Sequence, residues 1–132
     1  MILIALLSLL SVHSSVSVCQ TGDVLAGTRW AARVAEDCSD SVVFLSGHRV
    51  RQYSCEAGEW YNGSYTLSKD TVIITGVSVS EDGGGKEHWR NWYMYKGNFL
   101  KPTVSQGYSH GKWEKVKPST TPADYLFKKI GR

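Results

Sequence analysis

The chain has 132 residues and a formal charge of +3, from 15 basic and 12 acidic side chains. This length corresponds to one domain. This net positive charge is too small to indicate nucleic-acid binding, which would need basic residues interleaved with exposed aromatics in a recognisable module. Basic residues do gather near the C-terminus, and we interpret them as a solvated face: Lys112, Lys115, Lys117, Lys128, Lys129 and Arg132.

The first 17 residues are predicted to form a secretory signal peptide. Residues 1–10 are almost entirely apolar, and small and polar residues follow them. Ser15 and Ser17 provide small residues at positions −3 and −1, so we expect cleavage after Ser17, with cleavage after Ser14 as the alternative. A buried N-terminal strand is the competing interpretation. An apolar run of this length is too short to span a membrane, which needs roughly 20 residues. We therefore expect no transmembrane segment, and a mature domain of residues 18–132 that is secreted to the extracellular space or the periplasm.

The rest of the chain is predicted to be all-β. Short apolar runs are broken by Gly, Asn, Asp and Ser, which is typical of strands at regular spacing, and no segment shows a sustained helical period. Glycines mark a loop at 81–85, residues 107–111 read as a turn, and 118–122 read as a linker. The predicted strands are 29–36, 41–45, 49–55, 60–67, 71–79, 87–95, 99–104, 112–116 and a closing segment at 124–130.

These short sequential strands predict an antiparallel up-and-down β-barrel of about eight strands. Short links favour a meander, and closing the meander into a barrel removes its two unpaired edges. A two-sheet sandwich is the second choice.

Cys38 and Cys55 are predicted to form a disulfide across the hairpin that turns at Ser46-Gly47. A two-residue turn would place the two cysteines directly opposite each other, at a separation that a disulfide can bridge. A bulge at the turn would shift the pairing by one residue, setting Phe44 beside Val50 on the inner face and leaving the cysteines close. Two reduced core thiols are the alternative.

Cys19 remains unpaired in this scheme and lies just after the predicted cleavage point. It is either a lipid-anchoring cysteine or a free or intermolecular thiol. Lipid anchoring is the less favoured of these, because Val18 precedes the cysteine.

Aromatic residues are the strongest indication of a binding site. The chain has five Trp and seven Tyr, and a cavity lined by rings with a few polar groups is the usual form of a small-molecule site. A plainly packed interior is the alternative, since an eight-stranded barrel is only just wide enough for its own side chains or one small ligand. The residues predicted to line a ligand site are Trp30, Tyr53, Tyr65, Trp89, Trp92 and Tyr93.

No pattern indicates catalysis. His48, His88 and His110 lie on separate strands or turns without metal-ligand spacing, and the glycine run at 83–85 lacks the lysine and helix of a phosphate loop. Ser109 and His110 are adjacent, so on a strand they would face opposite ways. We therefore expect a protein that is not an enzyme and that has no metal, no cofactor and no catalytic residues.

Short motifs lie at the start, in the middle and at the end of the predicted mature chain. The start reads Leu25-Ala26-Gly27-Thr28-Arg29-Trp30, the middle contains Ala35-Glu36-Asp37-Cys38 and Gln52-Tyr53-Ser54-Cys55, and the end reads Tyr125-Leu126-Phe127-Lys128-Lys129-Ile130. These motifs resemble those of lipocalin-like (calycin) barrels. The resemblance implies that Trp30 packs across one end of the barrel, with Lys128 or Lys129 from the last strand over it.

The function that this resemblance implies is a secreted binding protein that holds a small, mostly apolar ligand in its barrel. The alternative is a secreted protein-interaction module, an inhibitor or a host-facing effector, on a packed barrel. The same start also resembles small bacterial barrel inhibitors of metalloproteases that carry an early disulfide. The expected partner is therefore a small hydrophobic ligand or an extracellular protein, and not nucleic acid.

Overall fold

The computed structural model describes residues 22–79, 83–116 and 125–132. The predicted signal peptide, Cys19, the predicted linker at 118–122 and the first two residues of the predicted loop lie outside these ranges. Within the described ranges the regular structure consists of β-strands. No helix among the described residues is long and apolar enough to cross a membrane.

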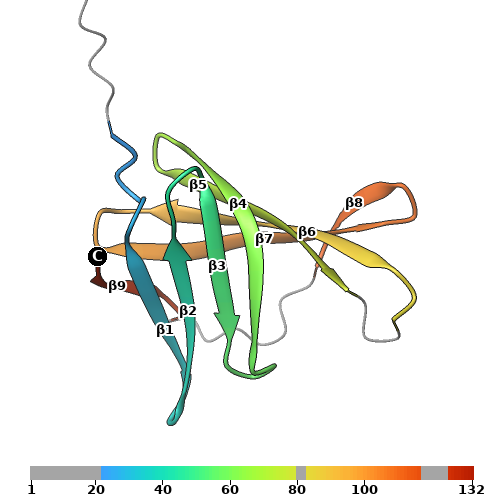
Figure 1. The fold of residues 1–132 in the computed structure, drawn as a ribbon, viewed down its shortest axis with the longest axis horizontal. Coiled ribbons are helices and arrows are strands. Elements are labelled where there is room, and N and C mark those ends of the chain that lie inside the picture. Colours follow the sequence, from blue (N-terminus) through green and yellow to red (C-terminus); the bar gives the residue numbers. More distant parts are fainter. Residues whose placement is uncertain (1–21, 80–82, 117–124) are drawn as a thin grey trace, which may run out of the picture.

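Nine strands make up the described part of the fold, in positions close to those predicted (Figure 1). Most of them are rich in β-branched and aromatic residues, and most of the connecting turns contain Gly, Asn, Asp or Ser. Their bounds are β1 Arg29–Ala35, β2 Cys38–Phe44, β3 Arg49–Ser54, β4 Glu59–Ser68, β5 Thr71–Val79, β6 Lys86–Tyr95, β7 Phe99–Ser109, β8 Lys112–Lys115 and β9 Phe127–Gly131.

Eight of these strands form a closed antiparallel barrel. From β1 to β7 each strand pairs with its neighbour in the chain, and β9 pairs with both β7 and β1, which closes the ring. β8 pairs with β7 outside the ring. The predicted up-and-down barrel is confirmed, and the alternative of a two-sheet sandwich is not what forms.

β7 is longer than predicted. It runs past residue 104 to Ser109, and the turn that follows is His110-Gly111, with φ angles of 50° and 78°. Pro102 lies within the strand, where it cannot donate a ladder hydrogen bond, and the β6–β7 register shifts there between Trp92 and Tyr93. The prediction ended this strand too early because Ser105, Gly107 and Ser109 have the composition of a turn.

The β2–β3 hairpin has the shifted register. Phe44 lies opposite Val50 and Ser41 opposite Tyr53, so the two-residue turn is wrong and the alternative with one more residue is correct. The loop includes Gly47 and His48, both with positive φ. Cys38 and Cys55 form the predicted disulfide, with their Cα atoms 5.5 Å apart.

Replacing both Cys38 and Cys55 by serine should lower the free energy of unfolding by about 2–4 kcal/mol, because the bridge restricts the unfolded chain. Urea denaturation of the double variant, beside the wild type with and without reductant, measures this loss. The reduced wild type should match the variant. A double variant as stable as the oxidised wild type would contradict the prediction.

One half of the barrel interior is filled by apolar side chains. Inward positions on successive strands carry fully buried residues, and the rings of Phe44 and Tyr65 meet edge to face at 4.7 Å. The segment before β1 covers this packed end: Leu25 is fully buried, and the backbone N–H of Gly27 donates to the carbonyl of Phe44 at 2.8 Å. The largest fully buried apolar side chains of the described residues are Trp30, Tyr65, Phe44, Leu25, Ile74, Leu100, Val42, Val50 and Val72.

Asp23 fastens this covering segment to the barrel. Its carboxylate accepts hydrogen bonds from the Tyr65 hydroxyl and from the backbone N–H groups of Leu25 and Ala26. Burial alone would raise the pKa of Asp23, but these hydrogen bonds outweigh it and the pKa is lowered. Burial and the bond to Asp23 both raise the pKa of Tyr65.

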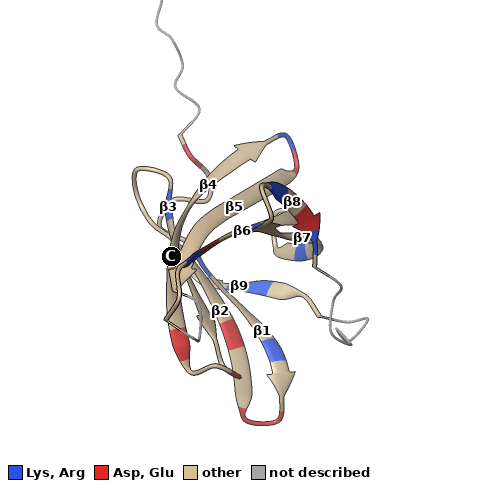
Figure 2. Cartoon of the chain, turned by 90° about the vertical axis from the view of Figure 1, so that its right-hand side faces the viewer, with Lys and Arg blue, Asp and Glu red and all other residues tan. Residues whose placement is uncertain are grey.

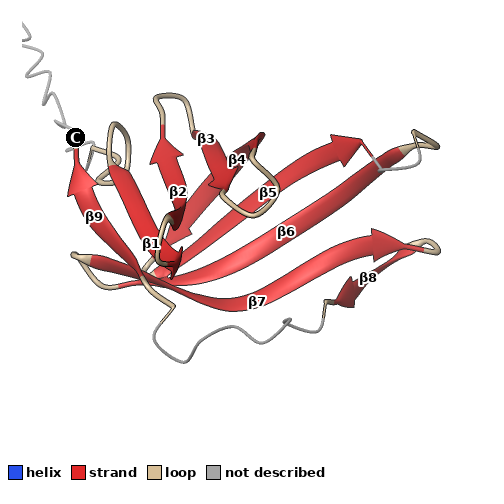
Figure 3. Cartoon of the chain, turned by 90° about the horizontal axis from the view of Figure 1, so that it is seen from below, coloured by secondary structure: helices blue, strands red, loops and turns tan. Residues whose placement is uncertain are grey.

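β5, β6 and β7 extend beyond the shorter strands of the ring (Figure 3). The β4–β5 ladder ends where Gly63 lies opposite Gly76, while the β5–β6 ladder continues to Val79 and Lys86. Trp89 lies over these two glycines: a Cβ on Gly76 would lie 2.2 Å from its Cζ2 atom, and a Cβ on Gly63 would lie 3.5 Å from its Cη2 atom. Gly76 therefore leaves the space that the indole occupies, whereas a Cβ on Gly63 would first meet the carbonyl oxygen of Thr75, 2.3 Å away.

Gly76→Ala should displace Trp89 and lower the free energy of unfolding by about 1–3 kcal/mol, the usual effect of overpacking. Gly131→Ala is the matched control, since a Cβ on Gly131 meets nothing within 4 Å. Thermal or urea unfolding of both variants measures the difference. Equal stability of the two variants would show that the indole moves aside without cost.

Candidate functional site

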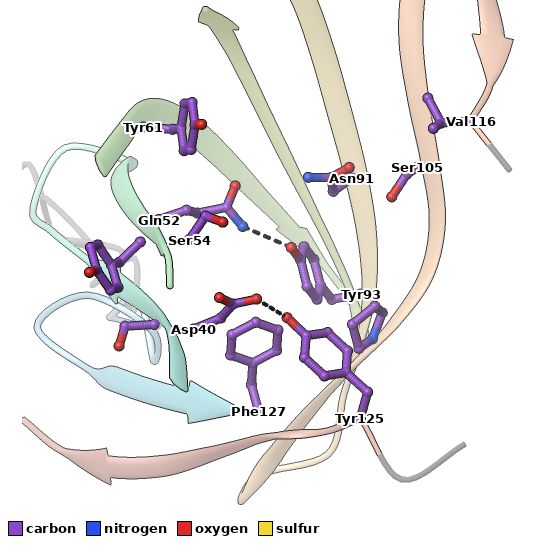
Figure 4. Close-up of a pocket in the computed structure, with 13 residues that line it drawn as sticks. Asp40, Gln52, Ser54, Tyr61, Asn91, Tyr93, Ser105, Val116, Tyr125 and Phe127 are labelled. Carbon is purple, nitrogen blue, oxygen red and sulfur yellow. Dashed lines mark hydrogen bonds between the residues drawn. The ribbon is translucent and has the colours of Figure 1, made fainter. Parts of the chain in front are cut away.

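The other half of the barrel interior holds a cavity of about 360 Å³. This volume is at the lower end of the range in which small-molecule sites fall. Figure 4 shows polar side chains and aromatic rings directed into it from β2, β3, β4, β6, β7 and the segment before β9. The labelled lining residues are Asp40, Gln52, Ser54, Tyr61, Asn91, Tyr93, Ser105, Val116, Tyr125 and Phe127.

The cavity forms because the inner face of several strands changes from apolar to polar partway along. On β2, inward positions alternate from Phe44 and Val42 to Asp40. On β3, they alternate from Val50 to Gln52 and Ser54. The large apolar residues thus fill one end, and shorter polar ones leave space at the other.

Asp40 is held in a fixed orientation at the cavity wall. Its Oδ1 atom accepts a hydrogen bond from the backbone N–H of Cys55 at 2.8 Å. Its Oδ2 atom accepts one from the hydroxyl of Tyr125 at 2.5 Å (Figure 4). Cys55 is in turn linked by the disulfide to Cys38, two residues before Asp40. The carboxylate is therefore positioned from both sides, by the disulfide region and by Tyr125 before the last strand.

A second hydrogen bond crosses the cavity from β3 to β6. The Nε2 atom of Gln52 donates to the hydroxyl of Tyr93 at 2.7 Å. Burial raises the pKa of Tyr93 to about 12, despite the opposing hydrogen bonds of Gln52 and Asn91. Burial, together with the bond to Asp40, also raises the pKa of Tyr125. Both hydroxyls are therefore protonated in the folded protein at neutral pH.

Three rings form the apolar side of the cavity. Phe127 meets Tyr93 at 6.0 Å and Tyr125 at 5.3 Å between ring centroids, both in edge-to-face geometry. Such pairs hold one another in defined positions. The cavity thus offers a rigid aromatic surface beside a carboxylate, amides and hydroxyls, a more polar lining than the sequence predicted.

Two of the predicted site residues border this cavity. Tyr93 is buried and contributes its ring and hydroxyl. Tyr53 is among the lining residues, but its ring packs against Trp60 at 5.1 Å, and Trp60 is exposed. Arg51 lies over the other ring of this pair, 4.6 Å from the centroid of Trp60.

Two others lie in the packed end. Trp30 and Tyr65 are almost completely buried, and their polar atoms bond to Thr28 and Asp23 respectively. They were predicted as cavity walls because aromatic residues on inward strand positions look the same at either end of a barrel.

The remaining two predicted residues also do not line the cavity. Trp89 covers Gly63 and Gly76. Trp92 lies between Asn91 and Tyr93, both of which face the cavity, so Trp92 points to the outer face. There it joins an outer cluster of His88, Arg90, Trp92, Tyr108 and Trp113, in which the guanidinium of Arg90 lies 5.0 Å from the ring centroid of Trp92 and 4.1 Å from that of Trp113.

Trp30 is the residue that the lipocalin resemblance places across one end of the barrel, beneath a lysine of the last strand. Trp30 packs across the filled end of the barrel, and Lys129 is directly opposite it in the β1–β9 ladder. The side chains of Lys128 and Lys129 are exposed, and the rings of Trp30 and Tyr95 meet in edge-to-face geometry with their centroids 6.1 Å apart.

The sequence did not identify Asp40, Gln52, Asn91 or Tyr125 as site residues. Inward alternation on β2 would have placed Asp40 on the same face as Val42 and Phe44, but its approach to Tyr125 requires the closed ring. Within the described ranges, no three His, Cys, Asp or Glu residues are grouped as a metal site.

The basic residues near the C-terminus do not form one patch among the described residues. Lys112 and Lys115 are on β8, which pairs with one end of β7, whereas Lys128 and Lys129 are on β9, which pairs with the other end (Figure 2). All four are exposed.

Comparisons with protein-family models, with curated proteins and with solved structures found no match to this chain.

Proposed function

We propose that this protein binds a small organic molecule inside its barrel. The observation that carries the proposal is the cavity of about 360 Å³ in one half of an otherwise packed interior. Its ring cluster suits an aromatic or short apolar body, and its carboxylate, amide and hydroxyl groups suit a ligand with hydrogen-bonding groups.

A lipocalin-like identity is part of this proposal. It is supported by the eight-stranded ring and by Trp30 at the packed end. Secretion is also part of it, because the Cys38–Cys55 disulfide is compatible with an extracellular or periplasmic location and the N-terminal segment is predicted to be a signal peptide.

Ligand-observed NMR with a panel of small aromatic and aliphatic compounds tests the proposal. Several compounds should bind to the wild type, and binding should be lost in Ser105→Phe, which fills the cavity from β7. Val104→Phe, on the opposite face of the same strand, is the matched control and should retain binding. Absence of any bound compound, or binding that persists in Ser105→Phe, would overturn the proposal.

A protein partner is the second candidate, and the outer cluster on β6, β7 and β8 favours it. Tyr108 is 46% exposed in this cluster, beside Trp113 and Arg90. Aromatic and arginine side chains together are typical of interaction surfaces. Co-precipitation from extracellular fluid should recover a partner with the wild type and with Ser105→Phe, but not with Trp113→Ala. Equal recovery with Trp113→Ala would refute this second candidate.

A further inference from the structure

We infer that the ligand of the cavity is a small organic monocation whose ammonium group pairs with Asp40. The inference rests on the proposed function of the cavity and specifies the chemistry of its ligand.

The charge of the cavity wall is the first argument. Among the described residues that line the cavity, Asp40 is the one with a formally charged side chain. Within the described ranges, Lys96 pairs with Asp70, Lys112 pairs with Glu114, and His48 lies 3.6 Å from Asp23; none of these contacts includes Asp40. The site therefore has a negative charge without a cationic partner from the described chain.

The geometry of the carboxylate is the second argument. Each oxygen of Asp40 accepts one hydrogen bond, from Cys55 and from Tyr125. An ionised carboxylate has about four acceptor sites, so each oxygen retains capacity for a further donor. Because both existing donors are fixed, by the disulfide and by the ring cluster, the carboxylate does not have to reorganise when a donor enters.

The aromatic lining is the third argument. Tyr93, Tyr125 and Phe127 surround the space next to Asp40 (Figure 4). The faces of aromatic rings carry partial negative charge and attract ammonium groups. A cation with an aromatic or short apolar body would therefore be stabilised by the carboxylate of Asp40 and by the aromatic rings. An anion would instead be repelled by the carboxylate.

Three compounds of similar shape test this inference on the unaltered protein: 2-phenylethylamine, 2-phenylethanol and phenylacetate, which are a cation, a neutral molecule and an anion at pH 7. Isothermal titration calorimetry should give an affinity for the amine at least about tenfold higher than that for the alcohol, the effect of a charge-assisted hydrogen bond. The anion should bind most weakly.

Asp40→Asn keeps an acceptor for Cys55 but removes the charge, and should abolish the preference for the amine while binding of the alcohol persists. Asp70→Asn, which removes the exposed carboxylate near Lys96, is the matched control and should keep the preference. If Asp40→Asn does not fold, the three-compound series on the wild type still shows whether the cavity prefers a cation.

The outcomes separate this inference from the proposed function. If the panel yields ligands but the amine binds no more tightly than the alcohol or the acid, the inference fails and the cavity remains a ligand site. Retention of the preference in a folded Asp40→Asn variant also overturns it. If the panel yields no ligand at all, the proposed function and this inference fail together.

Discussion

Trp30→Ala should lower the free energy of unfolding by about 3–5 kcal/mol, the usual effect of truncating a buried tryptophan. Trp30 is 1% exposed, and its ring meets that of Tyr95 in edge-to-face geometry. Its Nε1 atom donates to the hydroxyl of Thr28 at 2.8 Å, and that hydroxyl donates to the carbonyl of Leu25 at 2.6 Å. Removing the indole would therefore leave a cavity at the packed end and disturb the segment that covers it. Urea denaturation measures the loss.

Trp60→Ala is the matched control, because Trp60 is 45% exposed and contacts Tyr53 and Arg51 at the surface. Its effect should be under about 1 kcal/mol, since surface substitutions are usually mild. Similar losses in the two variants would show that the packed end does not depend on Trp30. Because a domain of this size has a total stability of about 5–15 kcal/mol, the Trp30 variant should also unfold at a clearly lower temperature.

Alkaline pH should destabilise the folded protein steeply above pH 10. The pKa of Tyr93 is raised by burial from 10.0 to about 12, and the pKa values of Tyr65 and Tyr125 are raised in the same direction. Above pH 10 these tyrosines ionise in the unfolded chain but keep their protons in the folded one. The unfolded state then binds fewer protons, so the free energy of unfolding falls as pH rises. The stability that the raised pKa values of these tyrosines contribute is fully present below pH 10.

For Tyr93 the loss should amount to about 1.4 kcal/mol for each pH unit between pH 10 and pH 12. Urea denaturation at a series of pH values measures this slope. In Tyr93→Phe the slope should become shallower by that amount, even though the variant also loses the bond from Gln52 at neutral pH. Tyr108→Phe alters an exposed residue and should leave the slope unchanged. An unchanged slope in Tyr93→Phe would contradict the prediction.

Most of the fold could be predicted because it depends on local patterns. Alternation and turn residues placed the strands to within a few residues, and the need to pair two edges favoured closure. β7 was cut short because Ser105, Gly107 and Ser109 have the composition of a turn. Of these three residues, Ser105 is small for a reason that is not local, because it borders the cavity. The register at Ser46-Gly47 depended on the backbone conformation of the turn, in which Gly47 and His48 both have positive φ, and the sequence could not decide it.

The site was harder to predict. The aromatic excess indicated a ligand site, but a ring gives no signal of which end of the barrel it lies in, so Trp30 and Tyr65 could not be distinguished from Tyr93. Asp40 and Tyr125 are distant in the chain and meet only when β9 completes the ring. Trp92 was assigned to the wall although its neighbours face the other way, because both faces of that strand carry aromatic residues.

The closure of the ring has a consequence for how the barrel folds. β9 joins β1 through the pairing of Arg29 with Gly131, so the first and last strands of the ring must find each other across about a hundred residues. Until then the growing sheet has two open edges, at β1 and at β7, which can pair with other chains. Folding dominated by such distant contacts is slow. We therefore expect closure of the ring, by pairing of β9 with both β1 and β7, to be a late and slow step of folding.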